Sequence, residues 1–359
     1  MKKDIWTNGV RIGPMQLHHA KMLVTKSKYF VKIFLMACIL CVGYRAKSQT
    51  IKMITSGTKT SLRGLSVVSN KIIWASGSAG TVALSTDSGK NFNWLAVKGY
   101  EKTDFRDIEA WDEKTAIIMG IDSPGIILKT VDGGLSWRLV YSNNAKGIFL
   151  DAMDFNGKKG VVVGDPLDGY FFMANTTNRG NTWQVVKQQN KIAAAKGEAA
   201  FASSGTNIRL LKNGTTVFVS GGVESNMYIN SKKILIPILQ GEETTGANSV
   251  AVKNNNVFMV VGGDFNKKDS TYKNCIITSK GVTFCVEPNK KPTGYRSCVE
   301  YILGEKWITC GLNGVDISTD GGVNFMKISG FSFNTCRKAK IGNAVFFVGG
   351  GGRIGKLIY

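Results

Sequence analysis

The sequence predicts an all-β fold, a seven-bladed β-propeller built from four-stranded antiparallel blades. Three observations support it. A short phrase with Asp, Gly and an aromatic residue recurs, and seven apolar runs end in glycine. In addition, a segment near each end of the chain could supply strands to one shared blade. With 359 residues, 43% apolar content, 42 glycines and only six prolines, the composition suits many short strands joined by tight turns.

The recurring phrase reads Ser/Thr-x-Asp/Asn-x-Gly-x-x-aromatic. Its successive aromatic residues are 45, 46, 101 and 41 residues apart, and the gap of 101 spans two periods. A period of roughly 40–50 residues indicates a repeat architecture. We expect a structural role, because Asp can close a turn, Gly permits a positive φ and the aromatic ring packs between blades. The residues with this role are Asp87, Gly89, Phe92, Asp132, Gly134, Trp137, Asn178, Gly180, Trp183, Asp320, Gly322 and Phe325; a degraded copy spans 279–284.

Seven apolar runs of strand length, each ending in glycine, predict the second strand of each blade. A further short apolar segment precedes every run and predicts the first strand, while the phrase itself follows and occupies the turn between the third and fourth strands. The seven runs are 72–77, 116–120, 161–164, 217–221, 257–262, 307–311 and 345–349.

The chain ends indicate how the repeat closes. After the seventh run, residues 354–359 can supply only a third strand, whereas residues 50–54 resemble a fourth strand without a blade. Pairing these two segments would complete the last blade and protect the sheet edges. A linear solenoid is the alternative arrangement.

The N-terminus resembles an export signal. Lysines 26, 28 and 32 precede an apolar run at 33–42, and a small-x-small sequence at 46–48 offers a cleavage site. We therefore expect a signal peptide at 22–48 within an N-terminal extension of residues 1–48, followed by one propeller domain at 49–359. An uncleaved anchor and lipoprotein processing at Cys38 are alternatives. Export would place the protein in the periplasm, at the cell surface or outside the cell.

Charge and composition after residue 48 exclude several kinds of chemistry. Residues 1–48 hold nine of the 46 basic and one of the 25 acidic residues, which leaves a net charge of about +13 and favours anionic partners. Both histidines, His18 and His19, precede the signal, so histidine-based catalysis and histidine-ligated metals are excluded from the mature chain. Its five cysteines show no Cys-x-x-Cys spacing, which argues against a zinc site; Cys298–Cys310 and Cys275–Cys285 disulfides or buried thiols are both open. We expect no metal and no cofactor.

The phrases resemble Asp-box (BNR) repeats, best at 132–137 and 320–325, and the fuller unit resembles propellers of the photosystem II assembly-factor family. The resemblance covers nearly all of 50–359, and segments such as 164–169 and 294–297 are similar to a non-photosynthetic bacterial branch whose members are sometimes labelled oxidoreductases. It implies a propeller that binds a partner protein. Residues 229–239 depart from it, because they lack the Asp, Gly and aromatic of the phrase.

Strand direction sorts the loops onto two faces. The Asp phrases lie on one face, called here the Asp-box face, and the beginnings of the first strands and the connections between second and third strands lie on the other, the start face. Three arginines occupy equivalent positions on the start face. They could form bidentate hydrogen bonds with carboxylates or sulfates of a ligand. Alternatively, they could pair with nearby acids of the protein and fill the central channel of the propeller. The candidate binding residues are Arg63, Arg106, Asp165, Asp168, Glu198, Asp264, Tyr295 and Arg296, with Asp122 and Glu224 nearby.

Three functions fit these observations. The favoured one is a non-catalytic, monomeric scaffold that binds a protein or an anionic glycan at the start face, without nucleic acid and without a membrane span in the mature chain. The second is a sialidase-like glycoside hydrolase that uses the arginine cluster with Tyr295 and Asp107 or Asp165. The third is an oxidoreductase with an unidentified cofactor, although no dinucleotide-binding loop is present.

Overall fold

The computed structural model describes residues 6–7, 10–11, 49–279 and 285–359. The signal peptide expected at 22–48, Cys38 included, and residues 280–284 of the degraded phrase lie outside the described residues. Residues Gln49–Ile358 form one compact unit. Outside this unit, β1 (Trp6–Thr7) and β2 (Val10–Arg11) form an antiparallel pair. Within the part of the chain that is described, no helix has the length and apolar character needed to cross a membrane.

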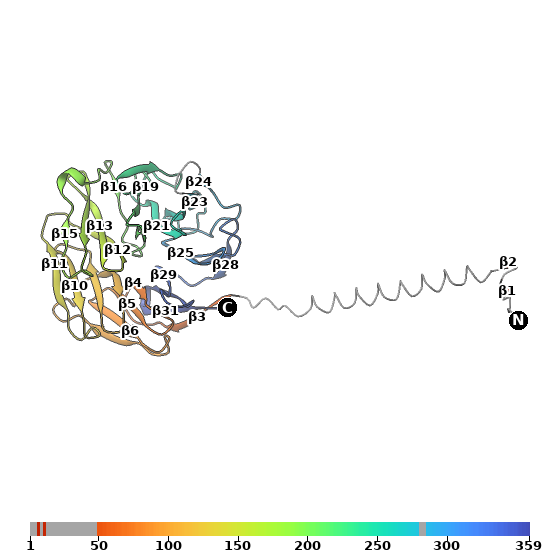
Figure 1. Cartoon of the computed structure of the whole chain (residues 1–359), viewed down its shortest axis with the longest axis horizontal. Helices are drawn as coiled ribbons and strands as arrows, with labels where there is room; N and C mark the ends of the chain where they lie inside the picture. The colour runs from red at the N-terminus through yellow and green to blue at the C-terminus, as the bar shows by residue number, and fades with distance from the viewer. Residues whose placement is uncertain (1–5, 8–9, 12–48, 280–284) are drawn as a thin grey trace. The chain divides into compact units, whose positions relative to one another are not determined.

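The unit is all-β and consists of antiparallel four-stranded meanders, as the sequence predicts. In Figure 1 the sheets lie side by side around a centre, with first strands such as β4, β12, β25 and β29 innermost. The first three sheets, in chain order, are β4 (Leu62–Val67), β5 (Ile73–Gly77), β6 (Thr81–Ser85) and β7 (Asn93–Ala96); β8 (Phe105–Ala110), β9 (Ala116–Gly120), β10 (Gly125–Thr130) and β11 (Arg138–Asn143); and β12 (Leu150–Asn156), β13 (Lys159–Leu167), β14 (Tyr170–Thr176) and β15 (Gln184–Val185).

The fourth and fifth meanders are joined, because β18 pairs with both β16 (Glu198–Ala199) and β21. Short 3-10 turns, η1 (Gln188–Asn190) and η2 (Gly350–Gly352), lie in connections. The fourth to sixth meanders are β17 (Ile208–Leu210), β18 (Thr216–Gly222), β19 (Asn226–Ile229) and β20 (Lys232–Leu235); β21 (Thr245–Lys253), β22 (Val257–Asp264), β23 (Cys275–Ser279) and β24 (Cys285–Val286); and β25 (Cys298–Leu303), β26 (Lys306–Gly311), β27 (Gly314–Ser318) and β28 (Met326–Ser329).

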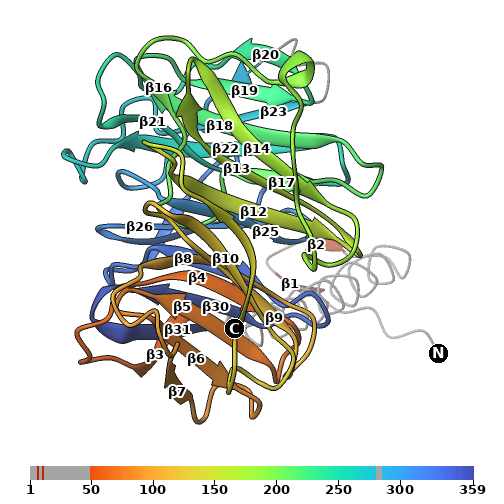
Figure 2. The ribbon, with the colours of Figure 1, turned by 90° about the vertical axis from the view of Figure 1, so that its left-hand side faces the viewer.

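The last sheet combines the two ends of the compact unit. Its strands are β29 (Thr335–Lys338), β30 (Val345–Gly349), β31 (Arg353–Ile358) and β3 (Thr50–Thr55). β3 pairs antiparallel with β31 over Thr50↔Ile358 to Thr55↔Ile354, and the two strands are seen together in Figure 2. The segment expected to act as a lone fourth strand therefore occupies that position.

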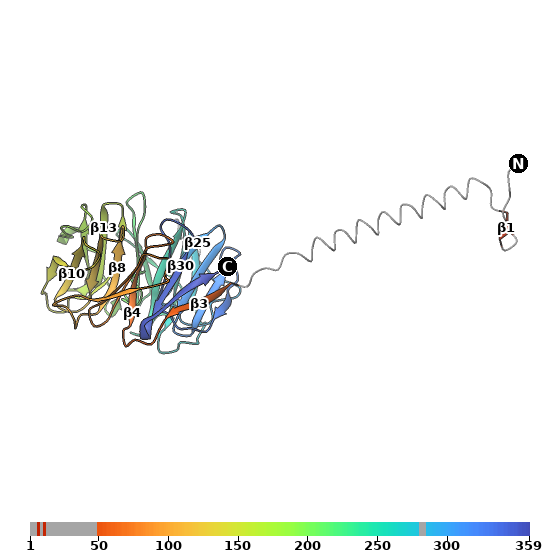
Figure 3. The same ribbon diagram turned by 90° about the horizontal axis from the view of Figure 1, so that it is seen from below.

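Burial explains why the second strands read as continuous apolar runs. Every residue of β5, β9 and β30 is buried, because both faces of the sheet are covered by neighbours. One apolar cluster, for example, joins Trp74 and Val82 of the first sheet to Ile118 and Leu128 of the second. Figure 3 shows strands such as β4, β8 and β30 running between the two faces of the unit.

The glycine that ends each second strand has a steric cause. A Cβ on Gly77 would lie 2.3 Å from the Ser61 carbonyl oxygen, and one on Gly311 would lie 2.2 Å from that of Tyr295. The backbone entering the first strand thus passes directly over the end of the second. The same approach of a carbonyl oxygen occurs at Gly164 and Gly262, whereas at Gly120 the nearest atom belongs to the Thr103 side chain. Lack of space for a Cβ therefore accounts for the recurring glycine.

The Asp phrases form the same turn in four sheets. In the second sheet, Thr130 Oγ1 donates to Asp132 (2.8 Å) and accepts from the Gly134 N–H (3.0 Å), while the Ser136 N–H donates to Asp132 (3.0 Å). The third sheet repeats the pattern with an amide, Asn178, in place of the carboxylate. The fourth sheet forms its outer strand β20 without the phrase, through a turn in which Asn230 has a φ of +53°.

We predict that Asp132→Asn keeps the turn but reduces the acid sensitivity of the fold. Hydrogen bonds from the Ser136 side chain and backbone lower the pKa of Asp132 from its ordinary 3.8 to about 2. A carboxyl whose pKa is lower in the folded state stabilises the fold above its unfolded pKa, and this contribution disappears as the pH falls toward the folded value. Urea unfolding between pH 6 and pH 2 should therefore show a smaller loss of stability below pH 4 in the variant. An identical loss in both proteins would contradict the prediction.

Candidate functional site

A cavity of about 300 Å³ opens at the start face, where the first strands begin. Its wall combines two arginines, three aromatic rings, amides and hydroxyls, and no acidic residue lines it within the part of the chain that the structure describes. The lining residues are Arg63, Arg106, Phe201, Ala202, Ser203, Asn248, Phe265, Tyr295, Ser297, Leu312 and Asn334. We call this the start-face cavity.

The two arginines of the start-face cavity differ in their partners. Arg106 Nε donates to the Asp104 carboxylate at 2.9 Å. Arg63 Nη1 donates to the Ser203 carbonyl oxygen at 3.0 Å, and the described residues give it no ion pair with a carboxylate. Burial and then the nearby Arg106 lower the pKa of Arg63. The cavity therefore presents a partly desolvated positive charge, which favours an anionic ligand.

Tyr295 supplies the polar and apolar parts of one wall. Its hydroxyl donates to Asn248 Oδ1 at 2.8 Å, and burial raises its pKa to about 12. Its ring meets Phe265 edge to face, with the ring centroids 6.4 Å apart. The hydrogen bond and the ring contact fix the orientation of the Tyr295 side chain, so that it offers a rigid surface to a ligand in the cavity.

The structure does not assemble the expected arginine trio, because Arg296 lies outside the cavity. Arg296 is fully buried and its Nε donates to Asp316 Oδ2 at 2.7 Å, while Nη2 forms a second, very close contact with the same oxygen. Nη1 donates to the Tyr295 carbonyl and to Asn313 Oδ1, and Nη2 donates to Thr293 Oγ1. All three nitrogen atoms of its guanidinium donate to groups of the protein. Arg296 therefore pairs with a nearby acid, which is the alternative that the sequence left open, and is not available to a ligand.

The acidic candidates are not among the lining residues of the start-face cavity. Asp165 accepts the Ala200 N–H, and burial raises its pKa to about 6. Asp168 is exposed in a turn at φ +51°, and Asp264 accepts the Asn266 N–H. The nearby Asp122 is exposed and Glu224 pairs with Lys233.

Glu198 is a structural centre of the fourth sheet. One of its oxygens accepts from Ser220, Asn226 and Tyr228 at 2.5–2.9 Å, and the other accepts from the Ala195 N–H and Lys233. Burial alone would raise the pKa of Glu198, but these hydrogen bonds outweigh it and lower the pKa. Glu198 thereby links the connection that precedes the fourth sheet to strands β18 and β19.

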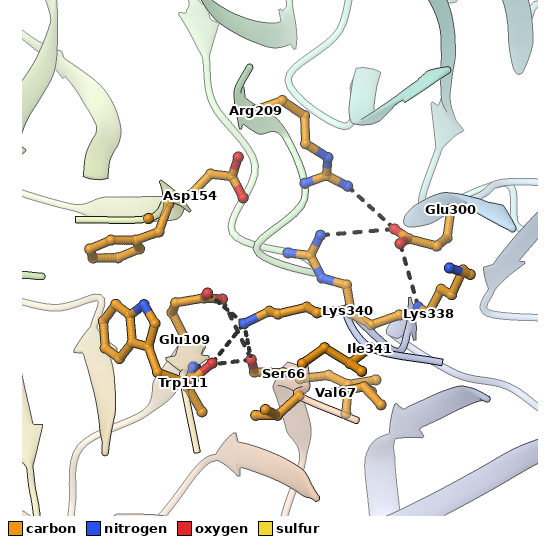
Figure 4. A pocket seen from close by; sticks show the side chains of 16 residues that line it. Ser66, Val67, Glu109, Trp111, Asp154, Arg209, Glu300, Lys338, Lys340 and Ile341 are labelled. Atoms are coloured by element: carbon orange, nitrogen blue, oxygen red, sulfur yellow. Dashed lines mark hydrogen bonds and ion pairs between the residues drawn. The ribbon is translucent and has the colours of Figure 1, made fainter. Parts of the chain in front are cut away.

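The sequence reasoning missed a second cavity, of about 400 Å³, at the opposite face, where the first strands end. We call it the Asp-box-face cavity (Figure 4). Its charges are largely paired: Glu300 lies 3.7 Å from Arg209 and 4.0 Å from Arg337, and Lys340 contacts Glu109 and Ser66.

A register signal could have revealed the Asp-box-face cavity. In five sheets, one residue of the first strand lines this cavity. It lies opposite the residue that stands three positions before the glycine ending the second strand. Four of these five first-strand residues are charged. The five are Ser66, Glu109, Asp154, Glu300 and Arg337.

Fold and cavities together define a propeller with Asp-box turns and a ligand-sized opening at each face. Residues 93–202 match the family described as Photosynthesis system II assembly factor YCF48, which confirms the resemblance seen in the sequence. No curated protein sequence gives a match.

Solved structures support the same fold. A structure of YCF48 bound to D1 peptide matches with a TM-score of 0.63 and 14% identity, over 88% of this chain and 96% of that chain. YCF48 from Cyanidioschyzon merolae matches with a TM-score of 0.58 and 13% identity, over 86% and 98%. The Neurospora crassa Pan2 WD40 domain gives 0.58 at 9% identity, over 87% and 96%. At these identities the likeness concerns the fold.

Proposed function

We propose that the chain is an exported, non-catalytic, seven-bladed propeller, closed by β3, which binds a partner protein through a carboxylate at the start-face cavity. One observation carries the choice of site: the lining residues include two arginines and three aromatic rings but no acid. A carboxylate placed between Arg63 and Arg106 would gain charge-assisted hydrogen bonds, and the rings would cover the apolar part of a peptide. A similar fold, YCF48, has been solved with a bound D1 peptide.

The charge distribution favours the start face over the Asp-box face. In the Asp-box-face cavity, Glu300 already pairs with Arg209 and Arg337, and Glu109 pairs with Lys340. An incoming carboxylate would have to displace these internal acids. In the start-face cavity, Arg63 imposes no such requirement, because it donates to a carbonyl oxygen, and the ion pair of Arg106 with Asp104 engages its Nε.

The geometry gives less support to the two catalytic alternatives. Arg296 is directed toward Asp316, so three guanidiniums do not converge on one substrate. Asp107 is buried among backbone N–H groups of Ile108 and Met153, and Asp165 does not line the cavity with Tyr295. No observation on the described residues favours an oxidoreductase.

We predict that the chain binds acidic peptides with a free C-terminal carboxylate and that Arg63→Gln weakens this binding about tenfold or more, the size expected for losing a hydrogen bond to a charged group. Fluorescence anisotropy with a peptide library, each member in free and amidated form, measures this. Affinity should also fall as ionic strength rises.

The matched control is Arg138→Gln, an exposed arginine on β11 that donates to Asn181. It should bind as the unsubstituted protein does. Equal binding of free and amidated peptides, or equal loss in both variants, would contradict carboxylate recognition at Arg63. Sulfated oligosaccharides included in the library report whether the anion belongs to a glycan instead.

A further inference from the structure

Three buried cysteines converge between the sixth and seventh sheets. Cys298 on β25 and Cys310 on β26 are directly opposite each other, and Cys336 comes from β29 of the next sheet. All three side chains have no solvent exposure, and their sulfur atoms lie within 4.8 Å of one another. The Sγ atoms of Cys298 and Cys336 are 3.6 Å apart. None of the three is in a disulfide.

Polar groups are directed at the central sulfur of this cluster. The Cys336 N–H donates to Cys298 Sγ at 3.4 Å, and Thr206 Oγ1 lies 3.6 Å from the same atom. The Arg337 guanidinium is within electrostatic range of Cys298. In the protonated form, Cys298 donates to the Cys336 carbonyl oxygen at 3.3 Å. Hydrogen bonds to sulfur and a nearby positive charge are the surroundings that stabilise thiolate ligands of a metal.

We propose that Cys298, Cys310 and Cys336 form a binding site for one soft, thiophilic cation, Cu(I), held by three sulfur ligands. Soft thiolate ligands suit Cu(I), zinc and iron–sulfur clusters, and an iron–sulfur cluster takes four such ligands. Metal–sulfur bonds of about 2.3 Å in a trigonal arrangement place sulfur atoms about 4.0 Å apart, within the span observed here. A structural zinc ion takes four ligands, and no fourth Cys, His, Asp or Glu joins this group within the described chain.

The cluster lies in the wall between the two cavities, next to residues that line them. Ser297, next to Cys298, lines the start-face cavity, and Glu300, two residues beyond, lines the Asp-box-face cavity. On either side of Cys336 in the sequence, Asn334 lines the start-face cavity and Arg337 lines the Asp-box-face cavity. Cu(I) binding does not depend on the peptide-binding function proposed above, because none of the three cysteines lines either cavity.

The test is anaerobic titration of the reduced full chain with Cu(I) in competition with a chromophoric Cu(I) chelator. Every sample carries Cys38→Ser and Cys41→Ser, so that only the five cysteines after residue 48 contribute. We expect one tightly bound Cu(I) per chain, an ultraviolet thiolate-to-copper charge-transfer band and a higher melting temperature with the ion bound. Cys298→Ser should weaken Cu(I) binding at least about tenfold, the smallest ratio reported for removing even an outer-shell partner of a metal ligand.

Cys285→Ser, on β24, is the matched control and should bind like the unsubstituted chain. Circular dichroism identifies a variant that fails to fold, in which case Cys310→Ser and Cys336→Ser give the same readout. Absence of competition with the chelator, equal Cu(I) affinity in the Cys298→Ser chain, or tighter binding of Zn(II) than of Cu(I) would overturn the proposal. So would a disulfide between any two of Cys298, Cys310 and Cys336, detected by peptide mapping of the unreduced chain.

Discussion

Asp316→Ala is expected to destabilise the fold by about 3–5 kcal/mol, the usual cost of leaving one member of a buried ion pair without its partner. Arg296 and Asp316 both have fully buried side chains, and Asp316 also accepts hydrogen bonds from the Thr293 backbone and hydroxyl. Removing the carboxylate would leave the guanidinium charged and buried without its partner. Equilibrium unfolding in urea measures the change.

Two controls separate the ion pair from general damage to this region. Asn313→Ala removes a single neutral acceptor from Arg296 and should cost about 1 kcal/mol. The double change Arg296→Met with Asp316→Leu should recover much of the stability lost in Asp316→Ala, since apolar replacement of a buried pair is often neutral. A loss below about 1 kcal/mol in Asp316→Ala, together with weaker peptide binding, would instead place Arg296 in the ligand site.

Deleting residues 49–55 is expected to produce the second large effect, because it removes β3 and exposes the backbone edge of β31. Loss of the buried Ile51 side chain alone corresponds to about 2–5 kcal/mol, and the lost strand pairing adds to it. Thermal unfolding followed by circular dichroism should show a marked fall in melting temperature relative to a chain that begins at Gln49.

Addition of a synthetic 49–57 peptide supplies the test of mechanism. If β3 closes the ring, the peptide should raise the melting temperature of the truncated chain in a concentration-dependent way. The same peptide with Ile51→Asp should not, because a carboxylate cannot enter the apolar cluster that Ile51 joins. Equal melting temperatures for the truncated and complete chains would contradict closure through β3.

The fold was predictable from the sequence because its signals are local and repeated. A glycine is required wherever one strand passes over the end of the next, and the Asp turn is completed within a few residues. Both constraints leave a periodic trace in the sequence.

The candidate site was only partly predictable because its side-chain directions depend on distant residues. Arg63 and Arg106 face the start-face cavity as expected, whereas Arg296 turns toward Asp316, twenty residues later in the chain. Similarly, the thiol cluster joins Cys298 to Cys336 across two sheets, and no sequence spacing identifies it.

Site-specific photo-crosslinking reports which of the two cavities the peptide occupies. A benzophenone side chain is placed either at Leu312, which lines the start-face cavity, or at Ile341, which lines the Asp-box-face cavity. Both positions are exposed, so each should accept the probe. With the tightest-binding carboxylate peptide from the library, we predict a crosslink from position 312 that amidation of the peptide abolishes, and none from position 341. Crosslinking from position 341 alone would contradict it.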